Sequence, residues 1–255
     1  MTNYLRIPLS TKKRHFVVGD IHGRYATFLN LLEEIEYNKE TDIIYSVGDL
    51  IDRGEDSVAT VEFFKQSNTH AVLGNHEQMI VNQRDWRDIW MYPPNGGPAT
   101  LASLKEYGYE LKWLENFCKK LPICIDVGEE DEENAFRIIH AECPSYWPED
   151  YFREYLIQYP DDAPEGDLLW GRKTVQEAVR NVKNMKLAGD GIKFAEPWTT
   201  RNVFCGHTPT QGVIRVGNMR WIDTFWGGTM TMMNAVTLDK FSVPMVFPDA
   251  NKVYI

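Results

Sequence analysis

The chain has 255 residues, of which 43% are hydrophobic, so it can form one large domain or at most two, with a substantial buried core. Its 37 acidic and 27 basic residues give a formal net charge of -10, which argues against broad binding to nucleic acid or to an anionic membrane. No apolar run approaches the roughly 18 residues of a membrane span, and the amino terminus lacks a secretory pattern, so we expect a cytoplasmic protein.

Strands and helices alternate in the first part of the chain. Short β-rich runs occur at residues 15–18, 43–47 and 70–73. Between them, residues 25–36 and 56–65 carry apolar side chains at helical spacing. This β-α-β-α-β order predicts an α/β fold that begins with parallel strands.

The middle of the chain is less regular. Residues 79–120 are expected to form a helical flank, in which Trp86, Trp90 and Trp113 are large side chains available for packing. Residues 123–139 are typical of a hairpin with an acidic turn.

The remaining third combines an insertion with further strands. Residues 144–198 are rich in proline and are expected to form a long insertion, with one helix at 174–186. Residues 202–205 predict another core strand. The β-rich stretches at 212–222 and 232–238 predict a second sheet that completes the domain.

Residues that can bind metal follow five of these strands. The chain reads Gly-Asp-Ile-His-Gly at 19–23, Gly-Asp-Leu-Ile-Asp-Arg-Gly at 48–54 and Gly-Asn-His-Glu at 74–77, and His140 and His207 follow two later strands in the same way. The carboxyl ends of parallel strands meet at one edge of a sheet, so these groups should lie together. Clustered carboxylates repel one another unless cations neutralise them, which predicts a site for a pair of divalent ions.

The three motifs resemble the signature motifs of the phosphoprotein phosphatase family, within the wider metallophosphoesterases, and their spacing is similar to that in its bacteriophage and bacterial serine/threonine phosphatases. Further similarity lies at residues 140–141, 169–172, 206–209 and 221–224. The resemblance implies a calcineurin-like metallophosphoesterase fold, a two-layer β sandwich flanked by helices. It also implies a single catalytic domain over residues 1–255.

The resemblance also implies a set of metal ligands. Asp20 and His22 resemble ligands of the first ion, and Asp49 resembles the carboxylate that bridges both ions. The residues that would complete the coordination of the second ion are Asn75, His140 and His207. Mixed carboxylate, imidazole and amide donors suit Mn²⁺, Fe²⁺ or Zn²⁺ better than Ca²⁺, and the family favours Mn²⁺.

The same comparison implies how the reaction would proceed. Two ions about 3.5 to 4 Å apart can hold a hydroxide that attacks phosphorus in line, without a covalent enzyme intermediate. His76 resembles the general acid that protonates the leaving alkoxide, and Asp52 resembles the carboxylate that orients it. Arg53 and Arg172 resemble the clamp on the phosphoryl oxygens.

The sequence therefore predicts a metal-dependent phosphoprotein phosphatase that hydrolyses phosphomonoesters on serine and threonine, with tyrosine as a further candidate. A dinucleoside polyphosphate hydrolase with the same dinuclear site is the alternative, but Asp52 and Glu77 favour the phosphatase. A catalytically silent phosphoprotein-binding module is disfavoured, because every expected ligand and His76 are present. The expected partner is a phosphoprotein or phosphopeptide, with no stable nucleic-acid binding, no membrane and no regulatory subunit.

Overall fold

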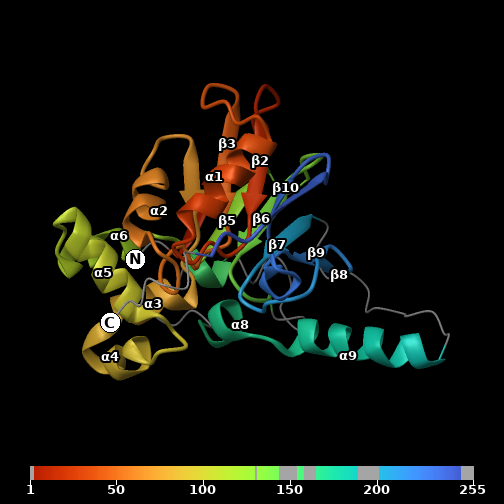
Figure 1. The fold of residues 1–255 in the computed structure, drawn as a ribbon. Coiled ribbons are helices and arrows are strands. Elements are labelled where there is room, and N and C mark those ends of the chain that lie inside the picture. Colours follow the sequence, from red (N-terminus) through yellow and green to blue (C-terminus); the bar gives the residue numbers. More distant parts are fainter. Residues whose placement is uncertain (1–2, 130, 144–153, 158–164, 189–200, 248–255) are drawn as a thin grey trace.

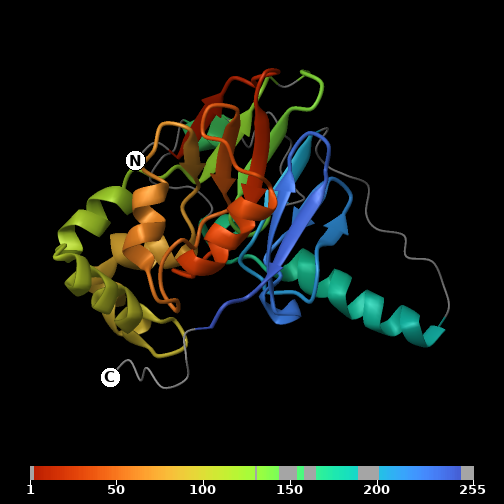
Figure 2. The same ribbon diagram turned by 45° about the horizontal axis from the view of Figure 1, so that its top comes forward.

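The computed structural model describes residues 3–129, 131–143, 154–157, 165–188 and 201–247. Within them, two β-sheets pack against each other and helices flank the sandwich (Figures 1 and 2). The predicted mixed α/β fold with a two-layer β sandwich is confirmed. None of the helices in the described part of the chain combines the length and the apolar character that crossing a membrane requires.

The five-stranded sheet has the strand order β11-β10-β2-β3-β4. Its strands are β2 (Arg14–Val18), β3 (Asp42–Ser46), β4 (Thr69–Ala71), β10 (Thr229–Asn234) and β11 (Lys240–Pro244). Strands β2, β3 and β4 run parallel and are connected through α1 (Tyr25–Glu34) and α2 (Ser57–Phe63), as predicted. Strand β10 pairs antiparallel with β2 on the other side.

The six-stranded sheet has the strand order β1-β5-β6-β7-β9-β8. Its strands are β1 (Tyr4–Ile7), β5 (Cys124–Val127), β6 (Phe136–Ile139), β7 (Asn202–Cys205), β8 (Ile214–Val216) and β9 (Met219–Trp221). Strands β5 and β6 form the expected antiparallel hairpin, and β7 runs parallel to both β6 and β9. The ends of β6 and β7 therefore point to the same edge of this sheet.

The expectation that the last strands build one second sheet is wrong. Strands β8 and β9 extend the six-stranded sheet, whereas β10 and β11 return to the five-stranded one. Strand β10 also ends earlier than predicted, because the Asn234 side chain accepts hydrogen bonds from the amides of Val236 and Thr237 and turns the chain. Leu238 then adopts a positive φ of 64° as the chain enters β11.

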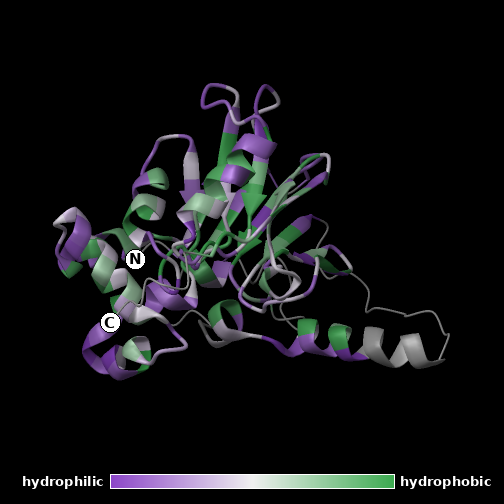
Figure 3. Cartoon of the chain, viewed as in Figure 1, coloured by the Kyte–Doolittle hydropathy of each residue, from purple (hydrophilic) through white to green (hydrophobic). Residues whose placement is uncertain are grey.

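Successive side chains along each strand point to opposite faces of the sheet, so they contribute to two separate apolar layers. In β2, the buried Val17 faces the other sheet and packs with Tyr45, Ile138 and Phe204. Its neighbours Phe16 and Val18 instead belong to the layer beneath the helices. Figure 3 shows hydrophobic residues concentrated in the central strands and hydrophilic ones on α4 and the outer loops.

Helices flank the sandwich on two sides. Helices α3 (Asn75–Val81), α4 (Gln83–Met91), α5 (Gly97–Tyr107) and α6 (Leu111–Cys118) occupy one side, and α8 (Glu165–Trp170) and α9 (Lys173–Ala188) follow later in the chain (Figure 1). The predicted helix at 174–186 lies within α9. Much of the expected insertion at 144–198 lies outside the described residues, and its extent stays a prediction.

Candidate active site

Six predicted metal ligands converge where the strands of both sheets end. Asp20 follows β2, Asp49 follows β3 and Asn75 begins α3, whereas His140 and His207 follow β6 and β7 of the other sheet. All six are at most 5% exposed, a set that comprises Asp20, His22, Asp49, Asn75, His140 and His207. The structure thus brings together groups separated by up to 187 positions in the sequence.

The loops that carry these residues approach one another closely. A Cβ atom on Gly74 would lie 2.3 Å from Oδ1 of Asp49, and one on Gly206 would lie 1.9 Å from Oδ1 of Asp20. Only glycine permits these approaches of backbone to carboxylate. Asp49 and His22 also hold positive φ angles of 51° and 49°, which occur at functional sites when the surrounding contacts maintain them.

Asp49 occupies the centre of the cluster. Its Oδ2 lies 3.5 Å from Nε2 of His22, and its Oδ1 lies 3.3 Å from Nε2 of His140. Two groups of possible ligands share it, one with His22 and His76 and the other with Asp20 and His140. Burial raises the pKa of Asp49, but the basic side chains around it, His76 and Arg53 among them, outweigh burial and lower it.

Hydrogen bonds to backbone carbonyls fix the tautomers of two histidines. Nδ1 of His22 lies 3.0 Å from the carbonyl of Ile51, and Nδ1 of His140 lies 2.7 Å from that of Val47. A carbonyl oxygen only accepts, so both Nδ1 atoms carry the proton and both Nε2 atoms present a lone pair. Burial lowers the pKa of both histidines, which keeps these rings neutral. Both lone pairs point towards carboxylate oxygens, an arrangement that a cation between them would stabilise.

A second group of donor atoms surrounds the amide of Asn75. Its Oδ1 lies 2.9 Å from Nε2 of His140 and 2.9 Å from Nδ1 of His207. Burial lowers the pKa of His207 to about 2, so its ring is neutral as well. Neutral imidazoles, ionised carboxylate and amide oxygen are the donor types that borderline divalent ions bind. These residues could therefore hold a pair of such ions.

His76 and Asp52 form a buried pair beside the cluster. Nδ1 of His76 lies 2.7 Å from Oδ2 of Asp52, and Nε2 of His76 lies 3.8 Å from Oδ2 of Asp49. Burial lowers the pKa of His76, but Asp49 and Asp52 outweigh burial and raise it. The imidazole can thus carry a proton on the nitrogen that faces the cluster.

The two predicted clamp arginines reach the same place. A guanidinium nitrogen of Arg53 donates to the lone pair on Nε2 of His22. Arg172 donates to the carbonyl of His207 at 3.2 Å. Burial lowers the pKa of Arg172, while Asp49 and Asp20 favour its charged form. Both cations thus lie beside the candidate metal ligands.

Sequence reasoning assigned no role to two carboxylates of this site. Glu77 accepts hydrogen bonds from the amides of Asp49, Leu50, Ile51 and Gly74 at 2.8 to 3.3 Å. Burial raises the pKa of Asp223 to about 6. Burial also raises the pKa of Asp20, and the nearby Asp223 carboxylate raises it further. The strand-end pattern could have identified Asp223, because it follows β9 as Asp20 follows β2.

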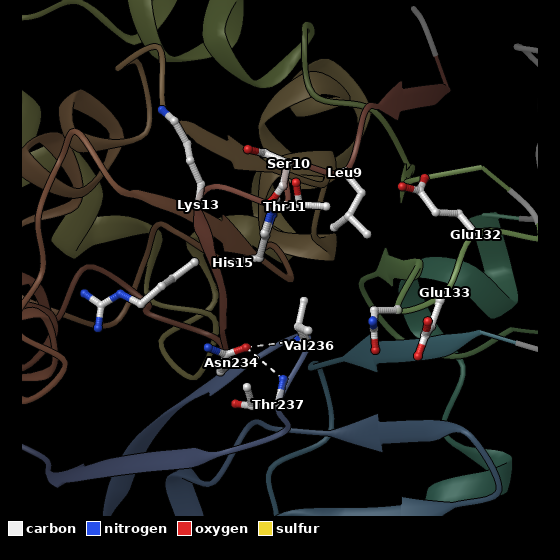
Figure 4. A pocket seen from close by; sticks show the side chains of 12 residues that line it. Leu9, Ser10, Thr11, Lys13, His15, Glu132, Glu133, Asn234, Val236 and Thr237 are labelled. Carbon is white, nitrogen blue, oxygen red and sulfur yellow. Dashed lines mark hydrogen bonds between the residues drawn. The ribbon is translucent and has the colours of Figure 1, made fainter.

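A pocket of about 340 Å³ lies away from this cluster (Figure 4). It is lined by residues of three turns, including Ser10, Lys13, Glu132 and Thr237. Lys13 and Arg14 lie at the amino end of β2, whereas the candidate ligands follow its carboxyl end. Neither group of possible metal ligands contributes to this pocket, so we place the active site at the cluster instead.

Comparison with known proteins identifies the family of the chain. Residues 14–215 match the family model of calcineurin-like phosphoesterases. The chain is 29% identical over 231 residues to serine/threonine-protein phosphatase 1 of Salmonella typhimurium, covering 90% of this chain and 95% of that protein. It is also 29% identical over 161 residues to a symmetrical bis(5'-nucleosyl)-tetraphosphatase of Shewanella, covering 61% and 54%.

Solved structures show the same fold. A protein provisionally described as a diadenosine tetraphosphatase superimposes with a TM-score of 0.64 at 20% identity, covering 97% of this chain and 100% of that one. The match to the family model spans most of the chain and includes all six candidate ligands. The resemblance to bacterial serine/threonine phosphatases is confirmed by the curated relatives. The chain therefore belongs to the calcineurin-like phosphoesterase family, whose members hydrolyse phosphoesters at a dinuclear metal site.

Proposed function

We propose that the protein is a metal-dependent phosphoprotein phosphatase that hydrolyses phosphomonoesters on serine and threonine. The observation that supports this most directly is the His76–Asp52 pair, which places a buried proton donor 3.8 Å from the carboxylate at the centre of the ligand cluster. An alkyl leaving group needs such a donor, because an alkoxide leaves poorly without a proton.

The proposed metal site uses the whole ligand set. Asp20 and His22 would hold one ion, Asp49 would bind both, and the other ion would be completed by Asn75, His140 and His207. We propose Mn²⁺ at both positions, with Fe²⁺ and Zn²⁺ as alternatives that the same donors accept. Bound ions would polarise the phosphoryl group and lower the pKa of the attacking water.

The remaining residues act on the substrate. Arg53 and Arg172 are proposed to bind the phosphoryl oxygens, since a guanidinium fork can meet two oxygens at once. His76 would give its Nε2 proton to the leaving oxygen as the P–O bond breaks. Asp52 would hold the other side of the ring and favour the protonated imidazole.

A dinucleoside polyphosphate hydrolase is the competing function, because relatives of that name also match the chain. Coverage favours the phosphatase, since the Salmonella phosphatase matches over 95% of its own length and the Shewanella tetraphosphatase over 54%. We expect kcat/KM for a basic phosphoserine peptide to exceed that for diadenosine tetraphosphate under the same Mn²⁺ loading. The reverse order would assign the site to nucleotide hydrolysis.

Three further expectations accompany this proposal. We propose that residues 1–255 act as one catalytic domain, that the protein works in the cytoplasm, and that it needs no regulatory subunit. Cell fractionation checks the location. Activity of the purified chain towards a phosphopeptide, without added protein, checks the other two.

A further inference from the structure

The carboxylate of Asp52 receives more hydrogen bonds than its pairing with His76 requires. Asp52 is fully buried at 0% exposure. Besides His76, the hydroxyl of Thr100 donates to Oδ1 at 2.6 Å, and the indole nitrogen of Trp90 lies 3.0 and 3.1 Å from the two oxygens. Both additional donors come from the helical flank, Trp90 from α4 and Thr100 from α5.

We propose that Trp90 and Thr100 are positioning residues, which fix Asp52 and through it direct the His76 ring towards the substrate. This inference rests on the proposed function, in which His76 is the proton donor. A carboxylate offers about four lone-pair directions, so it could turn within its site if His76 were its only partner. With Trp90 and Thr100 in place, Oδ2 stays directed at Nδ1 of His76.

The direction of each proton in this network follows from the chemistry of the partners. The Thr100 hydroxyl donates to an oxygen of the Asp52 carboxylate, which only accepts. The Thr100 oxygen in turn accepts from the Asp52 amide at 3.0 Å, and Ser57 donates to it at 3.0 Å. Thr100 therefore holds both the backbone and the side chain of Asp52. The backbone needs this support, because Asp52 has a positive φ of 73°.

Close packing fixes the position of the Trp90 side chain. Its side chain is fully buried at 0% exposure. A Cβ atom on Gly97, in the first turn of α5, would lie 2.8 Å from the indole ring, so glycine there lets α5 pack directly on Trp90. Between the two helices, the carbonyl of Pro94 accepts from Nε of Arg53 at 3.2 Å. Residues 90–100 thus contact two proposed active-site residues, Asp52 and Arg53.

Two conservative variants test the role, each removing a donor to Asp52 and keeping most of the side-chain volume; the threonine variant also removes the acceptor of the Asp52 amide. They are Trp90→Phe and Thr100→Val. Matched controls are Trp113→Phe and Thr69→Val. In the wild type the Trp113 ring stacks on Tyr109, and the Thr69 hydroxyl donates to the carbonyl of Phe63.

We expect each test variant to lower kcat on a phosphoserine peptide by roughly 10- to 100-fold, the usual effect of losing an outer hydrogen-bond partner. On an aryl phosphate, whose leaving group needs little protonation, the loss should stay below about 3-fold, with KM, metal content and both controls unchanged.

A spectroscopic measurement on the metal-free protein is independent of activity. The Nδ1 proton of His76, bonded to Asp52, should give a downfield and slowly exchanging proton resonance, identified by its absence in His76→Asn. We expect faster exchange or loss of this resonance in Trp90→Phe and Thr100→Val, in protein whose circular dichroism is that of the wild type. Equal kcat losses on both substrates, or an unchanged resonance in folded variants, would overturn the inference. A wild-type protein without phosphomonoesterase activity would refute the proposed function, while the resonance would still decide the positioning role.

Discussion

Asp49 and His76 lie 3.8 Å apart, yet the structure gives their side chains different chemistry. Asp49 lies between two histidine lone pairs and belongs to both groups of candidate metal ligands. His76 also belongs to one of these groups, but its Nδ1 bonds to Asp52, which leaves Nε2 to carry a proton. At the scale of single residues, metal binding and proton transfer should therefore be separable by mutation.

Replacing Asp49 should affect both metal ions. We expect Asp49→Ala to lose both bound ions after gel filtration, because one carboxylate is proposed to bridge them. Asp20→Ala is the matched comparison, since it removes a carboxylate proposed to bind only one ion, and it should retain the other. Elemental analysis of metal per chain makes the measurement, and two tightly bound ions in Asp49→Ala would refute the bridging role.

Replacing His76 should affect proton transfer and leave the ions in place. We expect His76→Asn to lower kcat by roughly 10²- to 10⁴-fold on a phosphoserine peptide, whose leaving group is poor. An aryl phosphate should lose much less activity. Steady-state kinetics on both substrates, with metal analysis, make the comparison. The same loss on both would mean that His76 positions the metal site instead.

At the scale of elements, the strands that end in motifs could be predicted and the contacts between distant elements could not. Strands β2, β3 and β7 were recognisable from apolar runs followed by Gly-Asp or Gly-His. Strands β1 and β11 were missed, because these short edge strands are only partly buried. Trp90 and Thr100 lie 38 and 48 positions from Asp52 in the sequence. The local sequence pattern therefore identified Trp90 only as a large side chain for the core, and it could not predict the contact of either residue with Asp52.

Glu77 joins the loops after β3 and β4, and its loss should weaken the fold. Its two oxygens accept four amide hydrogen bonds from the loops after β3 and β4. In Glu77→Gln, the side-chain NH2 group would face backbone N–H groups, from which it cannot accept a hydrogen bond. Leaving these buried backbone donors unpaired costs about 1–3 kcal/mol. We expect a reduction of that order in the free energy of unfolding in urea. Glu62→Gln, at a more exposed ion pair with Lys65, should change it by less than about 0.5 kcal/mol.

At the scale of the whole molecule, the site forms only when the two sheets meet. The five-stranded sheet supplies Asp20 and Asp49, and the six-stranded sheet supplies His140 and His207. An ion bound between them would connect the two layers, and a ligand that binds only the folded state stabilises it. The strand-end motifs were sufficient to predict this convergence, but not the return of β10 and β11 to the first sheet.

Buried histidines give the metal-free sandwich an acid-sensitive contribution to its stability. Burial lowers the pKa of five of them, namely His15, His22, His70, His140 and His207. The raised pKa values of His76, Asp20, Glu77 and Asp223 act in the opposite direction. In the unfolded chain these rings bind protons below about pH 6.5, whereas in the folded chain the five stay neutral. The contribution of each such histidine to the free energy of unfolding should therefore be complete above about pH 6.5 and should decrease below it, by up to about 1.4 kcal/mol per pH unit.

Urea unfolding of the metal-free protein at about pH 7.5 and about pH 5.5 measures this effect. The variant His15→Gln is a useful control, because His15 lies between the sheets against Tyr45 and belongs to neither group of possible metal ligands. It should reduce the difference between the two pH values without changing metal binding. The same difference between the two pH values in His15→Gln and in the wild type would mean that His15 becomes protonated in the folded protein.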